Sequence, residues 1–94
     1  MKHCILAKWA CNVTDKAALL PQIRALMYPA STIPGVRGVE VYPCCVDRAN
    51  RYDLMIVLDM DKDALPNWDA SDIHHRWKNE YGGLLEKKAI FDYE

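Results

Sequence analysis

Apolar residues recur along the chain with the spacing of β-strands in four segments. These segments are residues 2–11, 38–46, 52–60 and 88–93. In the first segment, the positions that share one face are His3, Ile5, Ala7 and Trp9. The second alternates as far as Pro43, where we expect the strand to end or bulge. The third is a nearly continuous apolar run, which is typical of a central strand covered on both faces.

The residues between the first two strands have the spacing of a helix. Apolar side chains recur at helical intervals over residues 16–27, and Thr14 and Asp15 precede them with side chains that cap helix N-termini. Pro21 lies inside this segment. It predicts either a kink near Ala17 or a short first turn followed by a new helix start.

A second helical region separates the third and fourth strands, and its capping residues divide it in two. Asp61 or Asp63 begins a short helix through Trp68, and Ser71 begins another through Tyr81. The order is therefore β-α-β-β-α-β with the second helix split. This is the ferredoxin-like pattern of an α+β sandwich.

The length of the chain limits it to one domain. Its 94 residues, 51% of them hydrophobic, fit a single unit over residues 1–94, since two domains would each be too small. A domain of this size buries about two-thirds of its unfolded surface. Because such a core is thin, we expect the chain to bury more surface by pairing with a second copy as a homodimer.

Charge and hydropathy argue against two classes of partner. The formal net charge is −1, with acidic and basic residues spread along the chain, so we expect no nucleic-acid partner. No apolar run approaches the roughly 18 residues that a membrane span needs, so we expect no membrane partner. Lys8 interrupts the apolar start of the chain, which argues against a signal peptide, and we expect a cytoplasmic protein.

The cysteines form neither a metal motif nor a disulfide motif. Cys4 and Cys11 lie in the first predicted strand, where a thiol acts as a small hydrophobe, and no C-x-x-C pair is present. A disulfide between the adjacent Cys44 and Cys45 would close a small, strained ring. We therefore expect free thiols, no bound metal and a reducing compartment.

Four stretches of the sequence together resemble one protein family. The start KHCILAKW resembles a Lys-His-apolar first strand, and IPGVRGVEV resembles an Ile-Pro-Gly-Val approach to the second. YDLMIVLDM resembles a Tyr-Asp third strand, and IFDYE resembles a closing Phe-Asp-Tyr. In their order and spacing, over nearly the whole chain, they resemble the stress-responsive A/B barrel domain (Dabb) family.

The resemblance implies a fold, an assembly and a chemistry. It implies ferredoxin-like protomers whose sheets pack together in a dimer as an α/β barrel, with the helices outside. The family includes a plant polyketide cyclase that closes a linear tetraketide by aldol condensation without a cofactor. The wider superfamily adds cofactor-independent monooxygenases. We therefore expect no cofactor here.

Residue by residue, the resemblance places the cyclase's catalytic histidine at His74, its first-strand histidine at His3 and its closing aspartate at Asp92. Trp68 stands where the cyclase has a catalytic tyrosine, and it can donate only an indole N–H. Residues 71–73 also depart from the family's His-Pro-x-His sequence.

His74 is the centre of the candidate chemistry. At neutral pH an imidazole can act as a general base and remove a proton alpha to a substrate carbonyl, if a pocket brings the substrate within about 3 Å. We expect Asp92 to orient its other ring nitrogen; the alternative is that His74 only caps or packs its helix. His75 points about 100° away from His74 around the helix, so we expect it in solvent. Adjacent histidines also lack the i, i+3 or i, i+4 spacing of a helical metal site.

Aromatic residues extend the candidate site. Trp77 and Tyr81 follow His74 on one helical stripe, which is typical of a core or a cavity wall. His3 either lines the same cavity or is satisfied by backbone, and Trp9 on the same strand face is expected to be a hydrophobic wall. The predicted substrate-binding residues are His3, Trp9, Trp68, Trp77 and Tyr81, and the predicted catalytic residues are His74 and Asp92.

Three functions agree with these residues. The first is a cofactor-free cyclase or lyase that acts on an aromatic or polyketide-like small molecule through His74. The second is a non-catalytic, stress-related protein that binds an apolar or aromatic ligand. The third is a cofactor-independent monooxygenase.

Overall fold

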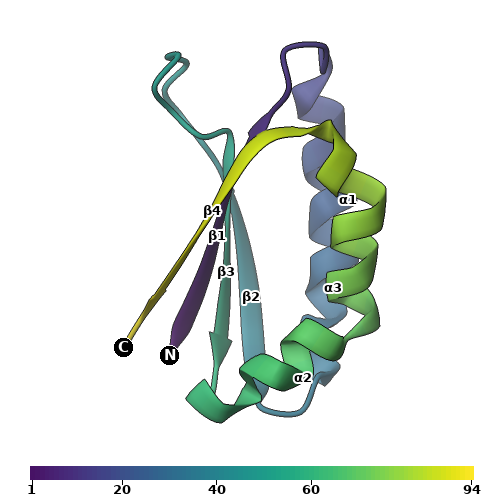
Figure 1. The fold of residues 1–94 in the computed structure, drawn as a ribbon, viewed down its shortest axis with the longest axis vertical. Helices are drawn as coiled ribbons and strands as arrows, with labels where there is room; N and C mark the ends of the chain where they lie inside the picture. Colours follow the sequence, from purple (N-terminus) through teal and green to yellow (C-terminus); the bar gives the residue numbers. More distant parts are fainter.

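The fold is a four-stranded antiparallel sheet with helices packed on one of its faces. The computed structural model describes residues 1–94. The strands are β1 (Lys2–Trp9), β2 (Val36–Pro43), β3 (Leu54–Met60) and β4 (Leu85–Tyr93), in the spatial order β2-β3-β1-β4. Figure 1 shows the helices on one side of the sheet and the other side open. The predicted ferredoxin-like α+β architecture is confirmed.

Helix α1 (Lys16–Met27) begins at its predicted cap. The Asp15 carboxylate accepts a hydrogen bond from the Ala18 N–H (3.3 Å). The helix runs through Pro21 without a break. The fixed φ of proline suits a helix, and the hydrogen bond that it cannot donate leaves only the carbonyl of the exposed Ala17 without a partner in the helix. A 3-10 turn (Tyr28–Thr32) follows directly.

The second helical region is split as predicted. Its parts are a 3-10 turn (Lys62–Ala64), α2 (Leu65–Ala70), α3 (Asp72–Arg76), a wider π-type turn (Trp77–Tyr81) and a last 3-10 turn (Gly82–Leu84). The Ser71 hydroxyl accepts a hydrogen bond from the His74 N–H (3.1 Å) and donates one to the Trp68 carbonyl (2.7 Å), so this residue begins α3 as expected. Asp61 makes no capping bond with its side chain. None of the helices is long and apolar enough to cross a bilayer.

The core lies between the sheet and the helices. The buried side chains of the central strands on the helix side are Ile5, Ala7, Trp9, Leu54, Ile56, Leu58 and Met60. The helices contribute Ile23, Leu26, Met27, Trp68 and Trp77 to the same cluster. Burying each large side chain contributes about 1.5–3 kcal/mol, so this cluster decides which face of the sheet the helices cover.

The opposite face of the sheet has no helix on it. Its side chains include Leu6, Tyr42, Met55, Val57, Phe91 and Tyr93. β3 is central in the sheet, as expected from its apolar run. Within one chain, however, only the helix side of β3 is fully buried, and its other side is half-buried. We call this surface the open face.

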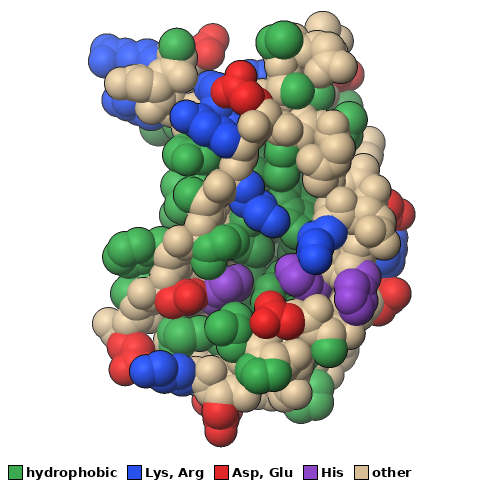
Figure 2. Space-filling model, viewed as in Figure 1, with side chains coloured by type: hydrophobic (Ala, Val, Ile, Leu, Met, Phe, Trp, Pro, Cys, Tyr) green, Lys and Arg blue, Asp and Glu red, His purple; other side chains and the backbone are tan.

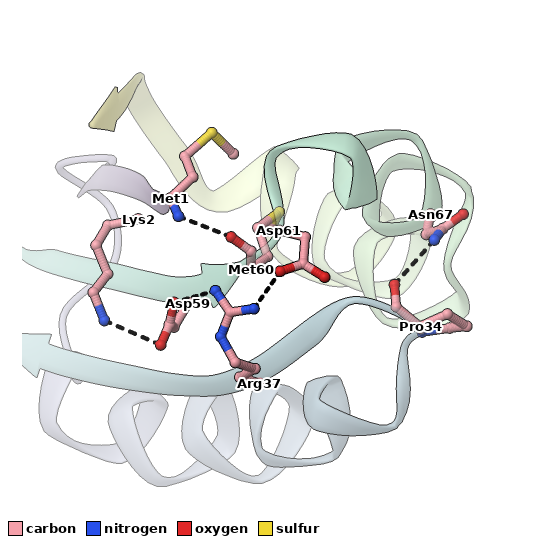
Figure 3. Close-up of polar contacts among 8 residues, drawn as sticks. All are labelled: Met1, Lys2, Pro34, Arg37, Asp59, Met60, Asp61 and Asn67. Carbon is pink, nitrogen blue, oxygen red and sulfur yellow. Dashed lines mark hydrogen bonds and ion pairs between the residues drawn. The ribbon is translucent and has the colours of Figure 1, made fainter. Parts of the chain in front are cut away.

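Arg37 connects the start of β2 to the end of β3. Figure 3 shows its guanidinium between two carboxylates: it donates to the Asp59 carboxylate at 3.1 Å and to that of Asp61. Lys2, which lies opposite Asp59 on β1, approaches the same carboxylate at 3.3 Å. The pKa of Asp59 is lower than its usual value, mainly because its carboxylate accepts the hydrogen bond from Arg37.

We expect the substitution Arg37→Gln to destabilise the protein at neutral pH and to have less effect in acid. The pKa of Asp59 is lower in the folded chain, so its stabilisation is fully present above the unfolded pKa of about 3.9 and is lost as the pH falls through the folded pKa. Urea unfolding of both proteins at pH 7 and in acid measures the difference. The control is Arg48→Gln, because Arg48 makes no ion pair. An Arg37→Gln effect of equal size at both pH values would contradict the prediction.

Candidate functional site

The helices leave the inner side of β4 uncovered. Ile5 on β1 lies opposite Ile90 on β4, so both side chains point to the helix side of the sheet. Ile5 is 2% exposed and Ile90 is 48% exposed. The helices therefore cover β1 and stop short of β4. Figure 2 shows the resulting furrow, with hydrophobic side chains along its floor and histidine side chains at its walls.

One wall of the furrow carries an imidazole and a carboxylate on neighbouring strands. His3 lies directly opposite Asp92, and Nδ1 of its ring is hydrogen-bonded to Oδ1 of Asp92. The His3 side chain is buried, whereas that of Asp92 is partly exposed. Because a carboxylate accepts hydrogen bonds, Nδ1 donates the proton and Nε2 is the nitrogen with the free lone pair.

The opposite wall is formed by His74 at the start of α3. Its Nδ1 lies 2.9 Å from the carbonyl oxygen of Asp69. A carbonyl accepts hydrogen bonds, so here too Nδ1 donates and Nε2 is left as the basic nitrogen. The side chain is half-buried. The neighbouring His75 is exposed, as expected.

The expected partnership between Asp92 and His74 is wrong. The register of β1 and β4 sets Asp92 against His3, and the two side chains pair on the same face of the sheet. His74 is oriented by the backbone of Asp69 in the preceding helical turn. No sequence pattern indicates this contact, because a backbone carbonyl is present at every residue.

Trp68 lies between the two histidines. The centroid of its ring is 6.4 Å from that of His3 and 5.1 Å from that of His74. The side chain is fully buried, at 0% exposure, and its indole N–H has no hydrogen-bond partner. A buried donor without a partner costs about 1–3 kcal/mol. The fold therefore keeps an unsatisfied polar group on a side chain that packs against two imidazoles.

The structure places Trp9 away from the furrow and buries Trp77 and Tyr81. Trp9 is six residues from His3 along β1, a separation of about 20 Å, and it borders a different cavity. Trp77 and Tyr81 are buried and stack with centroids 5.9 Å apart. The Tyr81 hydroxyl donates to the Gln22 side chain of α1 (3.2 Å), and burial raises its pKa. This pair attaches the turn after α3 to α1.

Two side chains of β4 were missed as furrow residues. Lys88 and Ile90 lie on the same side of β4 as Asp92, and both are exposed. Their spacing of two residues is the signal that could have found them. That signal identifies a shared face, but it does not say that the helices leave this face open.

Solved structures with this fold cover nearly the whole chain. A dimeric protein of unknown function with a ferredoxin-like fold, from Bacteroides fragilis NCTC 9343, has a TM-score of 0.80 and 19% identity over 99% of this chain and 93% of that one. A dabb family protein from Mesorhizobium loti MAFF303099 has a TM-score of 0.71 and 16% identity over 99% and 93%. The hydroxynitrile lyase of Passiflora edulis has a TM-score of 0.73 and 16% identity over 98% and 89%. No protein-family model and no curated protein matches the sequence.

These comparisons support the resemblance to the Dabb family. The chain has the ferredoxin-like fold of the dabb family protein, and the fold extends over almost the full length of both chains. At these identities the shared property is the fold, so the reaction has to be argued from the side chains of the site.

The cap of α3 gives a direct test of how His74 is positioned. We expect Ser71→Ala to lower the free energy of unfolding by about 1 kcal/mol, because the His74 N–H loses its acceptor. Urea unfolding measures this change. The control is Ser31→Ala, at an exposed serine in the 3-10 turn after α1. Equal stability of the two variants would contradict the assignment.

Proposed function

We propose that this protein binds an aromatic or polyketide-like carbonyl compound in the furrow and acts on it as a cofactor-free cyclase or lyase. His74 is the general base. The observation on which the proposal rests is the buried, unpartnered N–H of Trp68, whose ring packs against the imidazoles of both His3 and His74.

The chemistry follows from the free nitrogen of His74. With Nδ1 engaged by the Asp69 carbonyl, Nε2 is available to remove the proton next to a substrate carbonyl. Removal of that proton moves negative charge onto the carbonyl oxygen. A hydrogen-bond donor near this oxygen stabilises the charge, most strongly where water is excluded. The Trp68 N–H is a buried donor with no partner in the protein. Because Trp68 is 0% exposed, a substrate oxygen would satisfy this donor only when the surrounding side chains move apart on binding.

The His3–Asp92 pair supports a second polar contact. The Asp92 carboxylate fixes the orientation of the His3 ring and accepts a hydrogen bond from Nδ1. This leaves the free lone pair of the ring on Nε2. We assign this nitrogen to a hydroxyl group of the substrate. The Passiflora edulis enzyme of the same fold is a lyase, which agrees with carbon–carbon bond chemistry on this scaffold.

Exchange of α-protons in D₂O tests the base without knowledge of the natural substrate. An aryl methyl ketone and an aryl β-diketone are incubated with the protein, and loss of the α-proton signal is followed by NMR. We expect His74→Ala to lower the enzymatic exchange rate by about 10²–10⁴-fold, the usual contribution of a general base. Binding should change by less than about tenfold, which is the scale of one hydrogen bond.

The matched control is His75→Ala, because His75 is the exposed neighbour of His74. This variant should catalyse exchange of the α-protons at the wild-type rate. Exchange that is equally fast in His74→Ala would refute the assignment of the base.

Trp68 favours a second candidate function, ligand binding without chemistry, because an indole cannot supply an acidic hydroxyl. Binding of either probe by the wild-type protein without any exchange would favour this second function.

We also propose that two copies form a homodimer through their open faces. Phe91 on this face is 64% exposed, Tyr93 is exposed beside it, and Tyr42 is exposed on β2 at the opposite edge of the sheet. An apolar sheet face that lacks helices is stabilised when a second copy covers it, and a two-fold axis brings the same residues from both copies together. The Bacteroides fragilis protein of this fold is dimeric.

A charge on the open face should separate the copies. We expect Phe91→Glu to sediment as a monomer at micromolar concentration, because a buried carboxylate without a partner is strongly unfavourable. Tyr28→Glu is the matched control, since Tyr28 is 62% exposed but lies outside the sheet. It should sediment as the wild-type dimer. A wild-type protein that sediments as a monomer would refute the proposed assembly.

A further inference from the structure

A second cavity lies at the other end of the sheet from the furrow. It has a volume of about 520 Å³ and is bordered by the start of α1, the end of β1 and the connection between β2 and β3. Figure 1 shows this connection projecting beyond the end of the sheet. Trp9, Leu20 and Leu54 form an apolar wall of the cavity. None of the residues assigned to the furrow borders it.

The charges around this cavity favour an anion. Lys16 pairs with Asp53 (3.1 Å), whose second oxygen accepts the Trp9 N–H (2.8 Å), so these charges are already satisfied. Arg48 and Arg51 also border the cavity, and neither makes an ion pair. The remaining acidic group is Asp47. Neither guanidinium group is paired with a carboxylate, although that of Arg51 donates to the Asn50 side chain (2.8 Å). Two such groups against one carboxylate leave a net positive wall, and guanidinium groups bind carboxylates in a bidentate manner.

Two adjacent thiols lie on the same wall. Cys44 and Cys45 are both free and exposed, and both border the cavity. The Cys44 thiol is 3.3 Å from the Val46 carbonyl and donates to it, whereas the thiol of Cys45 makes no hydrogen bond. Exposed thiols in positively charged surroundings are the ones that react with disulfides. Cys45 is therefore the thiol that is free to react.

We propose that Cys45 forms a mixed disulfide with a small anionic disulfide of the glutathione type. The Cys45 thiolate attacks one sulfur of the disulfide, the original S–S bond breaks, and a new S–S bond joins the protein to one glutathionyl group. The other half leaves as a thiolate. The small disulfide is itself the oxidant. Arg48 and Arg51 bind its carboxylates and bring it to the thiol.

The neighbouring Cys44 is poorly placed to remove this modification. In many proteins a second cysteine attacks the mixed disulfide and releases the small thiol. Here that step would require a disulfide between adjacent residues, whose geometry is strained. The mixed disulfide at Cys45 therefore remains until an external thiol reduces it. The modification does not require the chemistry of the furrow, because none of the furrow residues borders the cavity. Cys45 and Arg51 also border a second pocket beside Leu6 and Met55 of the open face.

The test uses the full chain and glutathione disulfide. We expect mass spectrometry to find one glutathionyl group per chain, and peptide mapping to locate it on Cys45. Cys45→Ser should prevent the addition. Cys11→Ser should not, because Cys11 is equally free and exposed but does not border the cavity. Modification of Cys11 as fast as Cys45, or none at Cys45, would overturn the proposal.

A second measurement separates anion recognition from simple thiol exposure. The double variant Arg48→Gln, Arg51→Gln should react about tenfold more slowly with glutathione disulfide, within the usual range of electrostatic effects on association. Its rate with bis(2-hydroxyethyl) disulfide, which is uncharged, should equal that of the wild type. An unchanged rate with glutathione disulfide, or an equal loss with both reagents, would overturn the role of the arginines.

Discussion

The register between β1 and β4 is the constraint on which the candidate site depends. Side chains alternate along a strand, so a shift of one residue would turn every side chain of β4 to the other face. In the observed register His3 meets Asp92 and Ile5 meets Ile90 on the helix side. The same register sends Phe91 to the open face. The wall of the furrow and the surface for a second copy are thus set by one set of backbone hydrogen bonds.

The helices cover only part of the sheet, and the site lies where β4 is left uncovered. They bury the inner sides of β1 and β3 but not that of β4, so the edge strand carries exposed side chains on both faces. Trp68 and His74 come from the helical layer, and the Ser71 hydroxyl links the two through its hydrogen bonds. The unpartnered Trp68 N–H is a cost that the apolar packing of the core offsets. In the proposed function, a ligand oxygen removes this cost.

β1 connects two chemically different regions. The furrow lies near its first residues, and the cavity with the two cysteines lies near its last residue, Trp9. Imidazoles and a carboxylate dominate the first region, whereas guanidinium groups and thiols dominate the second. A separation of about 20 Å along a rigid strand allows each region to be altered by substitution without direct contact with the other.

The sequence by itself determined the elements and most of their limits. Periods of two and of 3.6 residues identified the strands and helices, and Asp15 and Ser71 were recognised as caps because their hydrogen bonds reach only three residues along the chain. The choice of partners was decided by the tertiary structure. Asp92 binds His3 and not His74, and Trp9 lies far from the furrow, because register and helix packing join residues distant in sequence. Local patterns contain no information on either.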